Sequence, residues 1–233
     1  AVADRDFMAE FIAACAITQV HISRIAEEVV LWASVEFGFV SLPDAFATGS
    51  SMMPQKKNAD VAELARGRSG RVLGEFVNLL TNMKGQPMTY NRDLQEDKQS
   101  AMNAAAVVIP TLTIFSAMMP ALTFNTERMR ATAGEGYSLT TDIADYLVRK
   151  GLPFREAHAT TGGLVRECEA RGCELNELPM DVYSAAHSLF EADVLDICVD
   201  TALASRDIPG GTAPNQVRKA AVDLAKGLDG RKV

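Results

Sequence analysis

A short segment near the middle of the N-terminal half gathers residue types that bind and activate a small anion. It reads Ala-Thr-Gly-Ser-Ser-Met-Met-Pro-Gln-Lys-Lys-Asn over residues 47–58. Its side chains offer two hydroxyls and two ammonium groups, from Ser50, Ser51, Lys56 and Lys57. Asn58 stands where we expect the N-cap of the following helix, whose free amides and positive dipole end attract anions. The segment predicts a binding site for a small carboxylate or phosphate.

Two alternatives to that interpretation have to be weighed. The segment lacks the GxxxxGK[ST] order of a nucleotide-binding P-loop, which disfavours ATP as the anion. A flexible surface loop with solvated lysines and an ordinary helix cap has the same composition. Residue types alone leave the functional and the structural interpretation equally open.

The elements that must position this segment are helical. Apolar residues recur at helical spacing, and stretches with strand-like alternation are short, so we expect an all-α fold. Three long helices are predicted: Asp6 to Trp32, Asn58 to Lys84, and Asp93 to Pro120 with a kink at Pro110. They form a long-helix bundle.

The third predicted helix is apolar on nearly every face from Ala104 to Leu122. A helix tolerates this only when neighbours surround it, and three helices from one chain cannot do so. We therefore expect helices of other subunits, or of a further part of the chain, to cover it. A membrane helix is the competing explanation, but Pro110 and Pro120 bracket a segment that we expect to be too short to span a bilayer.

Glycine becomes frequent after Asn125, and the predicted helices become shorter. We place a domain boundary near residues 131–136, which gives a bundle domain over residues 1–132 and a small helical domain over residues 133–233. Short helices are expected from Thr141 to Arg149, Pro153 to Ala170, Met180 to Ser188, Asp193 to Ala204 and Pro214 to Lys226.

Composition narrows the class of protein. The 233 residues carry a net charge of −7 and no Lys or Arg cluster, which disfavours nucleic acid and anionic membrane as partners. The four cysteines show no CxxC spacing, so we expect no metal or other cofactor and reduced thiols in a cytoplasmic protein.

Residues 49–58 match the GSSxMPxKxN signature of the fumarase/aspartase superfamily, which this chain resembles. The Gln-Lys-Lys variant is similar to the argininosuccinate lyase branch, as are the stretches at residues 4–7, 83–98, 141–148, 153–158 and 211–214. Two positions depart from the usual pattern: Ala59, where Pro is usual, and Gln86, where an apolar residue is usual.

The resemblance implies a reversible elimination of argininosuccinate to arginine and fumarate. It implies Ser50 as the base, and Ser51, Lys56 and Asn58 as ligands of the fumarate part. A serine hydroxyl is a poor base, so nearby amides and cations must favour its alkoxide. Glu63 would orient a catalytic histidine. Arg5 would approach a substrate carboxylate, and contacts to the succinyl or arginine portion would come from Tyr90, Gln95 and Lys98.

Each of these roles has a structural alternative. Glu63 could complement the helix dipole, Lys98 could pair with a neighbouring side chain or solvent, and Arg5 could be a surface charge. Other branches of the superfamily share the loop, among them adenylosuccinate lyase, fumarase and aspartase. Two further alternatives remain. One is a non-catalytic assembly module similar to the crystallins of this family, and the other is a helical scaffold that binds a partner along the apolar helix.

Members of the family are about twice as long, and the Thr-His segment that supplies their acid is not found in this sequence. We expect His21, His158 and His187 to be structural, and we interpret the chain as the C-terminal half of such a lyase. The resemblance implies a homotetramer in which three subunits contribute to each active site. On its own, the chain should then have negligible activity.

Overall fold

The computed structural model describes residues 3–230 and divides the chain into two compact units, Ala1–Arg128 and Met129–Val233. Helices dominate both units, and the four strands among the described residues have two residues each. The all-α prediction is confirmed. The division falls inside α5 (Thr126–Ala133), a helix that the sequence pattern did not predict. Each unit is described by itself.

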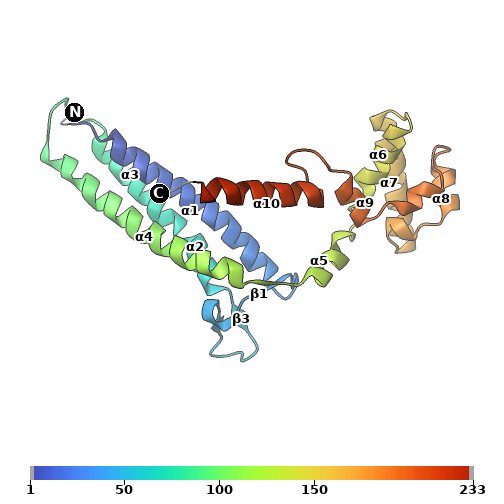
Figure 1. Ribbon diagram of the computed structural model, residues 1–233, viewed down its shortest axis with the longest axis horizontal. Coiled ribbons are helices and arrows are strands. Elements are labelled where there is room, and N and C mark those ends of the chain that lie inside the picture. Colours follow the sequence, from blue (N-terminus) through green and yellow to red (C-terminus); the bar gives the residue numbers. More distant parts are fainter. Residues whose placement is uncertain (1–2, 231–233) are drawn as a thin grey trace. The chain divides into compact units, whose positions relative to one another are not determined.

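Unit 1 is built on three long helices that lie side by side (Figure 1). They are α1 (Asp6–Trp32), α3 (Ser69–Met83) and α4 (Asp97–Met118), with α2 (Asp60–Gly67) preceding α3. Short 3-10 turns, η2 (Arg92–Glu96) and η3 (Met119–Ala121), flank α4. Buried aliphatic side chains from all four helices form two core clusters along the bundle.

The helix predicted from Asn58 to Lys84 is two helices in the structure. It is interrupted at Arg68, within the run Gly67-Arg68-Ser69-Gly70, whose glycines and serine form helix poorly. Gln19, fully buried on α1, donates from Nε2 to the carbonyl of Ala65 at 2.8 Å. This side-chain bond occupies a carbonyl of the last turn of α2 and ties α2 to α1.

Helix α4 continues through Pro110. The prediction that its prolines leave a segment too short to span a bilayer is wrong, because residues Arg92–Ala121 form one helical stretch of sufficient length and apolarity. Only 28% of its most apolar window is buried. One face packs in unit 1 through Ala104, Val108 and Phe115, while Met102 and Ile109 are each 62% exposed. Unit 1 alone therefore leaves much of α4 uncovered, as expected for a helix with partners on several sides.

Two pairs of short strands complete unit 1. Strand β1 (Val40–Ser41) pairs antiparallel with β4 (Thr123–Phe124), so the chain leaving α1 meets the chain leaving α4. Strand β2 (Thr48–Gly49) pairs antiparallel with β3 (Lys57–Asn58). A 3-10 turn, η1 (Asp44–Phe46), lies between β1 and β2. The segment over residues 47–58 is therefore a hairpin.

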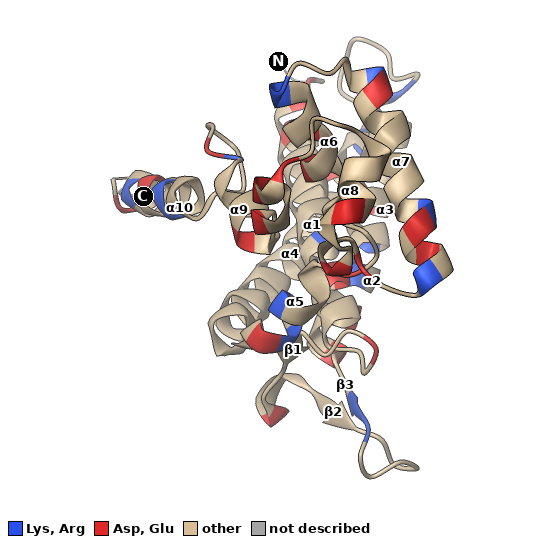
Figure 2. Cartoon of the chain, turned by 90° about the vertical axis from the view of Figure 1, so that its right-hand side faces the viewer, with Lys and Arg blue, Asp and Glu red and all other residues tan. Residues whose placement is uncertain are grey.

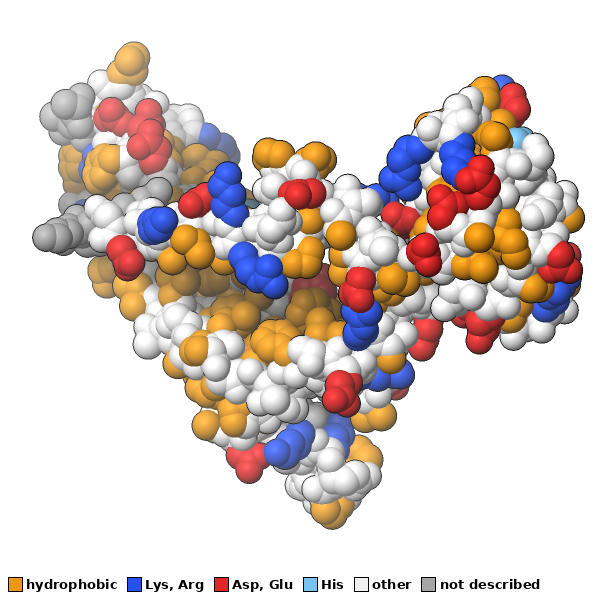
Figure 3. All heavy atoms as spheres, turned by 45° about the vertical axis from the view of Figure 1, so that its right-hand side comes forward, with side chains coloured by type: hydrophobic (Ala, Val, Ile, Leu, Met, Phe, Trp, Pro, Cys, Tyr) orange, Lys and Arg blue, Asp and Glu red, His pale blue; other side chains and the backbone are white. Residues whose placement is uncertain are grey.

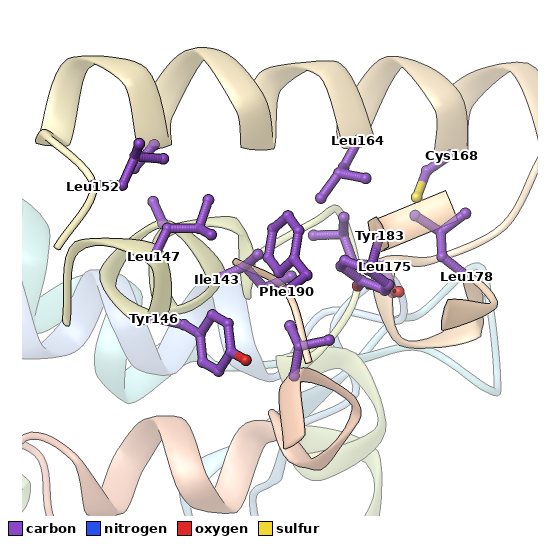
Figure 4. Close-up of a cluster of buried hydrophobic side chains, with 13 residues drawn as sticks. Ile143, Tyr146, Leu147, Leu152, Leu164, Cys168, Leu175, Leu178, Tyr183 and Phe190 are labelled. Carbon is purple, nitrogen blue, oxygen red and sulfur yellow. Dashed lines mark hydrogen bonds between the residues drawn. The ribbon is translucent and has the colours of Figure 1, made fainter. Parts of the chain in front are cut away.

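Unit 2 consists of shorter helices around one core. They are α6 (Thr140–Arg149), α7 (Phe154–Arg171), η4 (Leu175–Glu177), α8 (Met180–Ala186), η5 (Ala192–Asp196), α9 (Val199–Ala204) and α10 (Pro214–Asp229). Figure 4 shows Leu164 and Cys168 of α7 pointing towards side chains of α6 and α8. Burial of this core raises the pKa of Cys168 to about 11 and that of Tyr183 to about 12.

The predicted helices of unit 2 are confirmed within a few residues, with one exception. The helix expected from Asp193 to Ala204 is split into η5 and α9. Cys198 between them has extended backbone and serves as the N-cap of α9. Gly172 ends α7 with φ +67°, the left-handed conformation that glycine adopts without strain.

Candidate active site

The hairpin of β2 and β3 presents the Gly-Ser-Ser segment at the end of unit 1 where α1 ends (Figure 1). Thr48 lies opposite Asn58, and Gly49 lies opposite Lys57. The ladder is extended by the amide of Ser50, which donates to the carbonyl of Lys56 at 3.2 Å. The hairpin thus fixes the two ends of the segment and leaves its tip, residues 51–56, exposed.

Ser50 occupies the position in the hairpin that best fits a base. Its Oγ accepts hydrogen bonds from the amides of Met52 at 3.1 Å and Met53 at 3.0 Å. Amide donors directed at one oxygen favour its negatively charged form. The side chain is only partly exposed, while the neighbouring Ser51 is exposed. The structure therefore distinguishes the two serines, and it gives Ser50 the amide support that an alkoxide requires.

The two lysines of the segment have different surroundings. Lys57 forms an ion pair and hydrogen bond with Asp44, and this contact lowers the pKa of the Asp44 carboxyl. Lys56 precedes the two residues of β3, and its side chain is exposed. Within residues 3–230, no carboxylate lies at ion-pair distance from Lys56. Lys56 is thus the lysine available to an anionic ligand. Figure 2 shows blue, basic positions on the hairpin beside β3.

Asn58 is not the N-cap that the sequence analysis expected. It belongs to β3, and Ala59 is the N-cap of α2, with no side-chain cap bond. Thr48 instead donates from Oγ1 to the carboxylate of Asp60, the first residue of α2. The Asn58 side chain is therefore not required for capping. Lys57, Asn58 and apolar neighbours line a small cavity of about 190 Å³ beside the hairpin.

Glu63 lies in the first turn of α2 and is exposed. Arg66 forms a 2.6 Å ion pair with Glu27 of α1, which raises the pKa of Arg66, and the charge of Glu63 adds to this effect. Both the proposed orientation of a histidine and the dipole interpretation fit this position, so the role of Glu63 stays a prediction.

A second group of predicted site residues lies at the start of α1 and α4. Arg5 forms a 2.5 Å ion pair from Nε to Asp97 Oδ2, and Lys98 Nζ lies 3.4 Å from Asp97 Oδ1. Asp97 is 4% exposed, so two cations meet one buried carboxylate. The structure gives Arg5 a structural partner, and its contact with substrate stays a prediction.

Tyr90 and Gln95 belong to the same group. Gln95 donates from Nε2 to Tyr90 Oη at 2.5 Å, and both side chains are exposed. Tyr90 lines a cavity of about 630 Å³ formed mainly by the turn between α3 and η2, with Asp4, Met83 and Leu94. This is the largest of the cavities found among the described residues. Its size suits a small organic ligand.

The two groups lie at opposite ends of unit 1. Helix α1 starts beside Arg5 and ends beside the β1 and hairpin region, and its 27 residues span about 40 Å. Figure 1 shows the turn between α3 and α4 near the N-terminal end and the hairpin at the other end. The structure thus brings Ser50, Lys56, Asn58 and Glu63 together, brings Arg5, Tyr90, Gln95 and Lys98 together, and keeps the two groups apart.

None of the three histidines of the chain belongs to the hairpin elements. His21 is an exposed residue in the middle of α1, beside Arg24 and Glu28. In unit 2, His158 packs against Phe154, and His187 Nδ1 accepts from the amide of Leu189 at 3.1 Å. The described residues also include no group of three or more His, Cys, Asp or Glu side chains arranged to hold a metal ion.

Sequence analysis missed Asp44, Asp60 and Asp97, the carboxylates that organise the two groups. Asp97 was detectable in principle, because it is the acid that begins an otherwise apolar helix. Asp44 and Asp60 depend on the pairing of β2 with β3, and no local pattern predicts that pairing.

Two family models match this chain. The model described as "Argininosuccinate lyase C-terminal" matches residues 137–202, and the model described as "Lyase" matches residues 1–74. The first covers most of the core of unit 2, and the second covers α1, the hairpin and α2.

Curated relatives match nearly the whole chain. It is 50% identical over 220 residues to an argininosuccinate lyase of Symbiobacterium thermophilum, which covers 94% of this chain and 48% of that protein. It is 48% identical over 237 residues to an argininosuccinate lyase of Cupriavidus necator, which covers 99% of this chain and 50% of that protein. The chain spans about half the length of the curated relatives it matches.

Solved structures share the fold. A variant of EDDS lyase with bound fumarate matches with a TM-score of 0.78 at 28% identity, over 98% of this chain and 47% of that one. A class II fumarase from Schistosoma mansoni matches with a TM-score of 0.69 at 15% identity, over 84% of this chain and 38% of that one, which concerns the fold alone.

Proposed function

We propose that this chain, a member of the argininosuccinate lyase family, supplies two separate segments to the active sites of an enzyme that converts argininosuccinate to arginine and fumarate. The identity to lyases of that name extends through both units. The substrate is a small polyanion, in keeping with the hydroxyls, amides and free cation of the hairpin.

The observation that carries this proposal is the pair of amides at Ser50 Oγ, at 3.1 and 3.0 Å, in a hairpin that also presents Lys56. As an alkoxide, Ser50 removes the proton from the carbon next to a carboxylate of the succinyl part. The electron pair left on that carbon forms the double bond of fumarate. The carbon–nitrogen bond then breaks, and its electron pair leaves with the guanidinium nitrogen, which an acid from another segment protonates.

Negative charge accumulates on the succinyl carboxylate during this reaction. Lys56 and Asn58 flank Lys57 in the hairpin and are the groups that stabilise this charge. Ser51 contributes a hydroxyl at the exposed tip. Arg5, Tyr90, Gln95 and Lys98 receive the remaining part of a substrate molecule, in a different active site of the assembly.

The separation of the two groups supports sites shared between subunits. A residue at one end of α1 cannot reach a substrate held at the other end of a helix about 40 Å long. Large exposed apolar side chains on α4, and on α1 and α3, provide surface for helix packing between subunits (Figure 3). We therefore propose a soluble, cytoplasmic homotetramer. In this tetramer, neighbouring subunits cover α4, the helix whose length and composition alone would allow it to cross a membrane.

The proposal is tested by reconstitution. The chain is combined with the half of the Symbiobacterium thermophilum relative that it does not match, and fumarate formation from argininosuccinate is followed in the ultraviolet. The mixture should be active and the chain alone should not. Ser50→Ala should abolish the activity, whereas Ser51→Ala, one residue away without the two amide bonds, should retain a measurable part of it.

Full activity of the chain alone, or of the Ser50→Ala mixture, would contradict the proposal. Adenylosuccinate, malate and aspartate serve as further substrates in the same assay. Activity with one of them in place of argininosuccinate would assign the chain to another branch of the superfamily.

A further inference from the structure

The turn over residues 84–91 carries Tyr90 but has little backbone support. Gly85, with φ +72°, takes the chain out of α3, and the last helical bond joins Lys84 N to Leu80 O at 3.1 Å. Inside the described turn, one backbone hydrogen bond is found, from Thr89 N to Pro87 O at 2.7 Å. A turn of this length needs side-chain bonds to keep one conformation.

Gln86 provides those bonds. Its Nε2 donates to the carbonyl of Asn82 at 3.0 Å and to Asp93 Oδ2 at 2.6 Å. Its Oε1 accepts from Asn91 Nδ2 at 3.4 Å. The side chain is half-buried and uses its amide nitrogen and its oxygen together. One residue thus joins the end of α3, the end of the turn and the first turn of η2.

A second bond closes the same network. Asn82 donates from Nδ2 to the carbonyl of Asp93 at 2.7 Å, so α3 and η2 are held to each other as well as to Gln86. Gln86 and Tyr90 both line the 630 Å³ cavity, and Tyr90 Oη is bonded to Gln95. The conformation of the turn therefore determines how Tyr90 faces the cavity and where its hydroxyl meets Gln95.

We propose that Gln86 is a positioning residue that braces the turn over residues 84–91, so that Tyr90 faces the cavity, with its hydroxyl bonded to Gln95, in the geometry that receives the arginine portion of the substrate. The identity of the ligand rests on the proposed function, whereas the brace itself rests on the hydrogen bonds. An apolar side chain, usual at this position in the family that the sequence resembles, has no polar atoms with which to make these bonds.

The brace is tested on the chain itself by amide hydrogen exchange. Gln86→Leu keeps a similar volume and removes all three bonds, so exchange of the amides in residues 86–91 should accelerate about fivefold or more. Gln99→Leu is the matched control, because Gln99 bonds to Asn103 on the surface of α4 and not to the turn. It should leave exchange in the turn unchanged.

An exchange of donor and acceptor provides a rescue. Gln86→Glu alone places a carboxylate against Asp93 and should loosen the turn further. Combining it with Asp93→Asn restores a donor–acceptor pair in reverse, so the double variant should exchange more slowly than Gln86→Glu. Unchanged exchange in Gln86→Leu, or no recovery in the double variant, would overturn the brace.

The effect on substrate is measured in the reconstituted lyase. Gln86→Leu should raise KM for argininosuccinate about fivefold and change kcat by less than about twofold, because the turn binds substrate and carries no reacting group. The Gln99→Leu control should change neither constant. A fall in kcat at constant KM would contradict a positioning role. An inactive wild-type mixture would count against the proposed function, and the exchange data would still decide on the brace.

Discussion

Arg5 Nε lies 2.5 Å from Asp97 Oδ2, with side chains 14% and 5% exposed, so a largely buried ion pair joins the start of α1 to the start of α4. Removing Arg5 would leave the buried Asp97 carboxylate with Lys98 alone, whose exposed ammonium lies 3.4 Å away. The pair therefore stabilises the end of unit 1 that carries Tyr90, Gln95 and Lys98.

We predict that Arg5→Met lowers the free energy of unfolding of unit 1 by about 3 kcal/mol. The double variant Arg5→Met with Asp97→Leu should recover a large part of the loss, since it removes both charges. Urea unfolding followed by the fluorescence of Trp32, the single tryptophan of the chain, reports on this unit. A double variant less stable than Arg5→Met would show that the charges do not compensate each other.

Lys56 and Lys57 should respond differently to loss of charge. Lys57 is engaged with Asp44, and Lys56 has no such carboxylate in the described part of the chain. In the reconstituted lyase, Lys56→Gln should lower kcat/KM by at least about 100-fold, because it removes a cation that stabilises developing charge. Lys57→Gln should lower it by less than about tenfold, since exposed ion pairs contribute little. Equal losses for the two variants would contradict separate roles for the two lysines.

Gly211 is predicted to tolerate no side chain. A Cβ there would lie 2.0 Å from the carbonyl oxygen of Arg206, a backbone atom that cannot move aside cheaply. Gly211→Ala should therefore destabilise unit 2 by about 2 kcal/mol and weaken the 2.9 Å ion pair of Arg206 with Asp142. Gly227→Ala in α10, where a Cβ would meet open space, is the matched control and should be neutral or slightly stabilising. Thermal unfolding by circular dichroism compares the two.

The acid stability of unit 2 should depend on Asp193. A hydrogen bond from Tyr146, aided by Lys150, lowers the pKa of the Asp193 carboxyl. A carboxyl with a lowered pKa in the folded state stabilises the fold above its unfolded pKa of about 3.9, and that contribution is lost as the pH falls through the folded pKa.

Asp193→Asn should remove this part of the acid transition. We expect the midpoint temperatures of the wild type and the variant to differ near neutral pH and to converge as the pH falls below about 4. The measurement is the midpoint temperature as a function of pH. A difference that stays constant into acid would show that the charge of Asp193 is not the source of the stability.

Local patterns predicted the helices more reliably than the contacts between them. The bounds of α1 agree with the sequence prediction because its apolar stripe is regular from Phe7 to Trp32. The helix predicted from Asp93 to Pro120 does run through Pro110, whereas the break at Arg68 was missed, because it depends on what surrounds the helix. The pairing of Val40 with Phe124 joins residues far apart in the chain, and no local signal encodes it.

The same distinction applies to the candidate site. Residue types singled out the Ser50 segment, and the family resemblance added Tyr90, but residue types did not separate Ser50 from Ser51 or Lys56 from Lys57. Those differences arise from the pairing of β2 with β3 and from the carboxylates of Asp44 and Asp60, which contact Lys57 and Thr48 of the hairpin. The placement of the two groups at opposite ends of α1 likewise required the fold.

The most direct test of shared active sites is a mixing experiment with two inactive variants of the reconstituted lyase. Ser50→Ala removes one group, and Lys98→Met removes part of the other. If each site takes these residues from different subunits, dissociating the two assemblies and reassociating them in equal amounts should restore about a quarter of the wild-type sites, and of the fumarate formation. If one subunit supplied both residues to the same site, the mixed assembly would stay inactive, and the account of two separate contributions from one chain would be wrong.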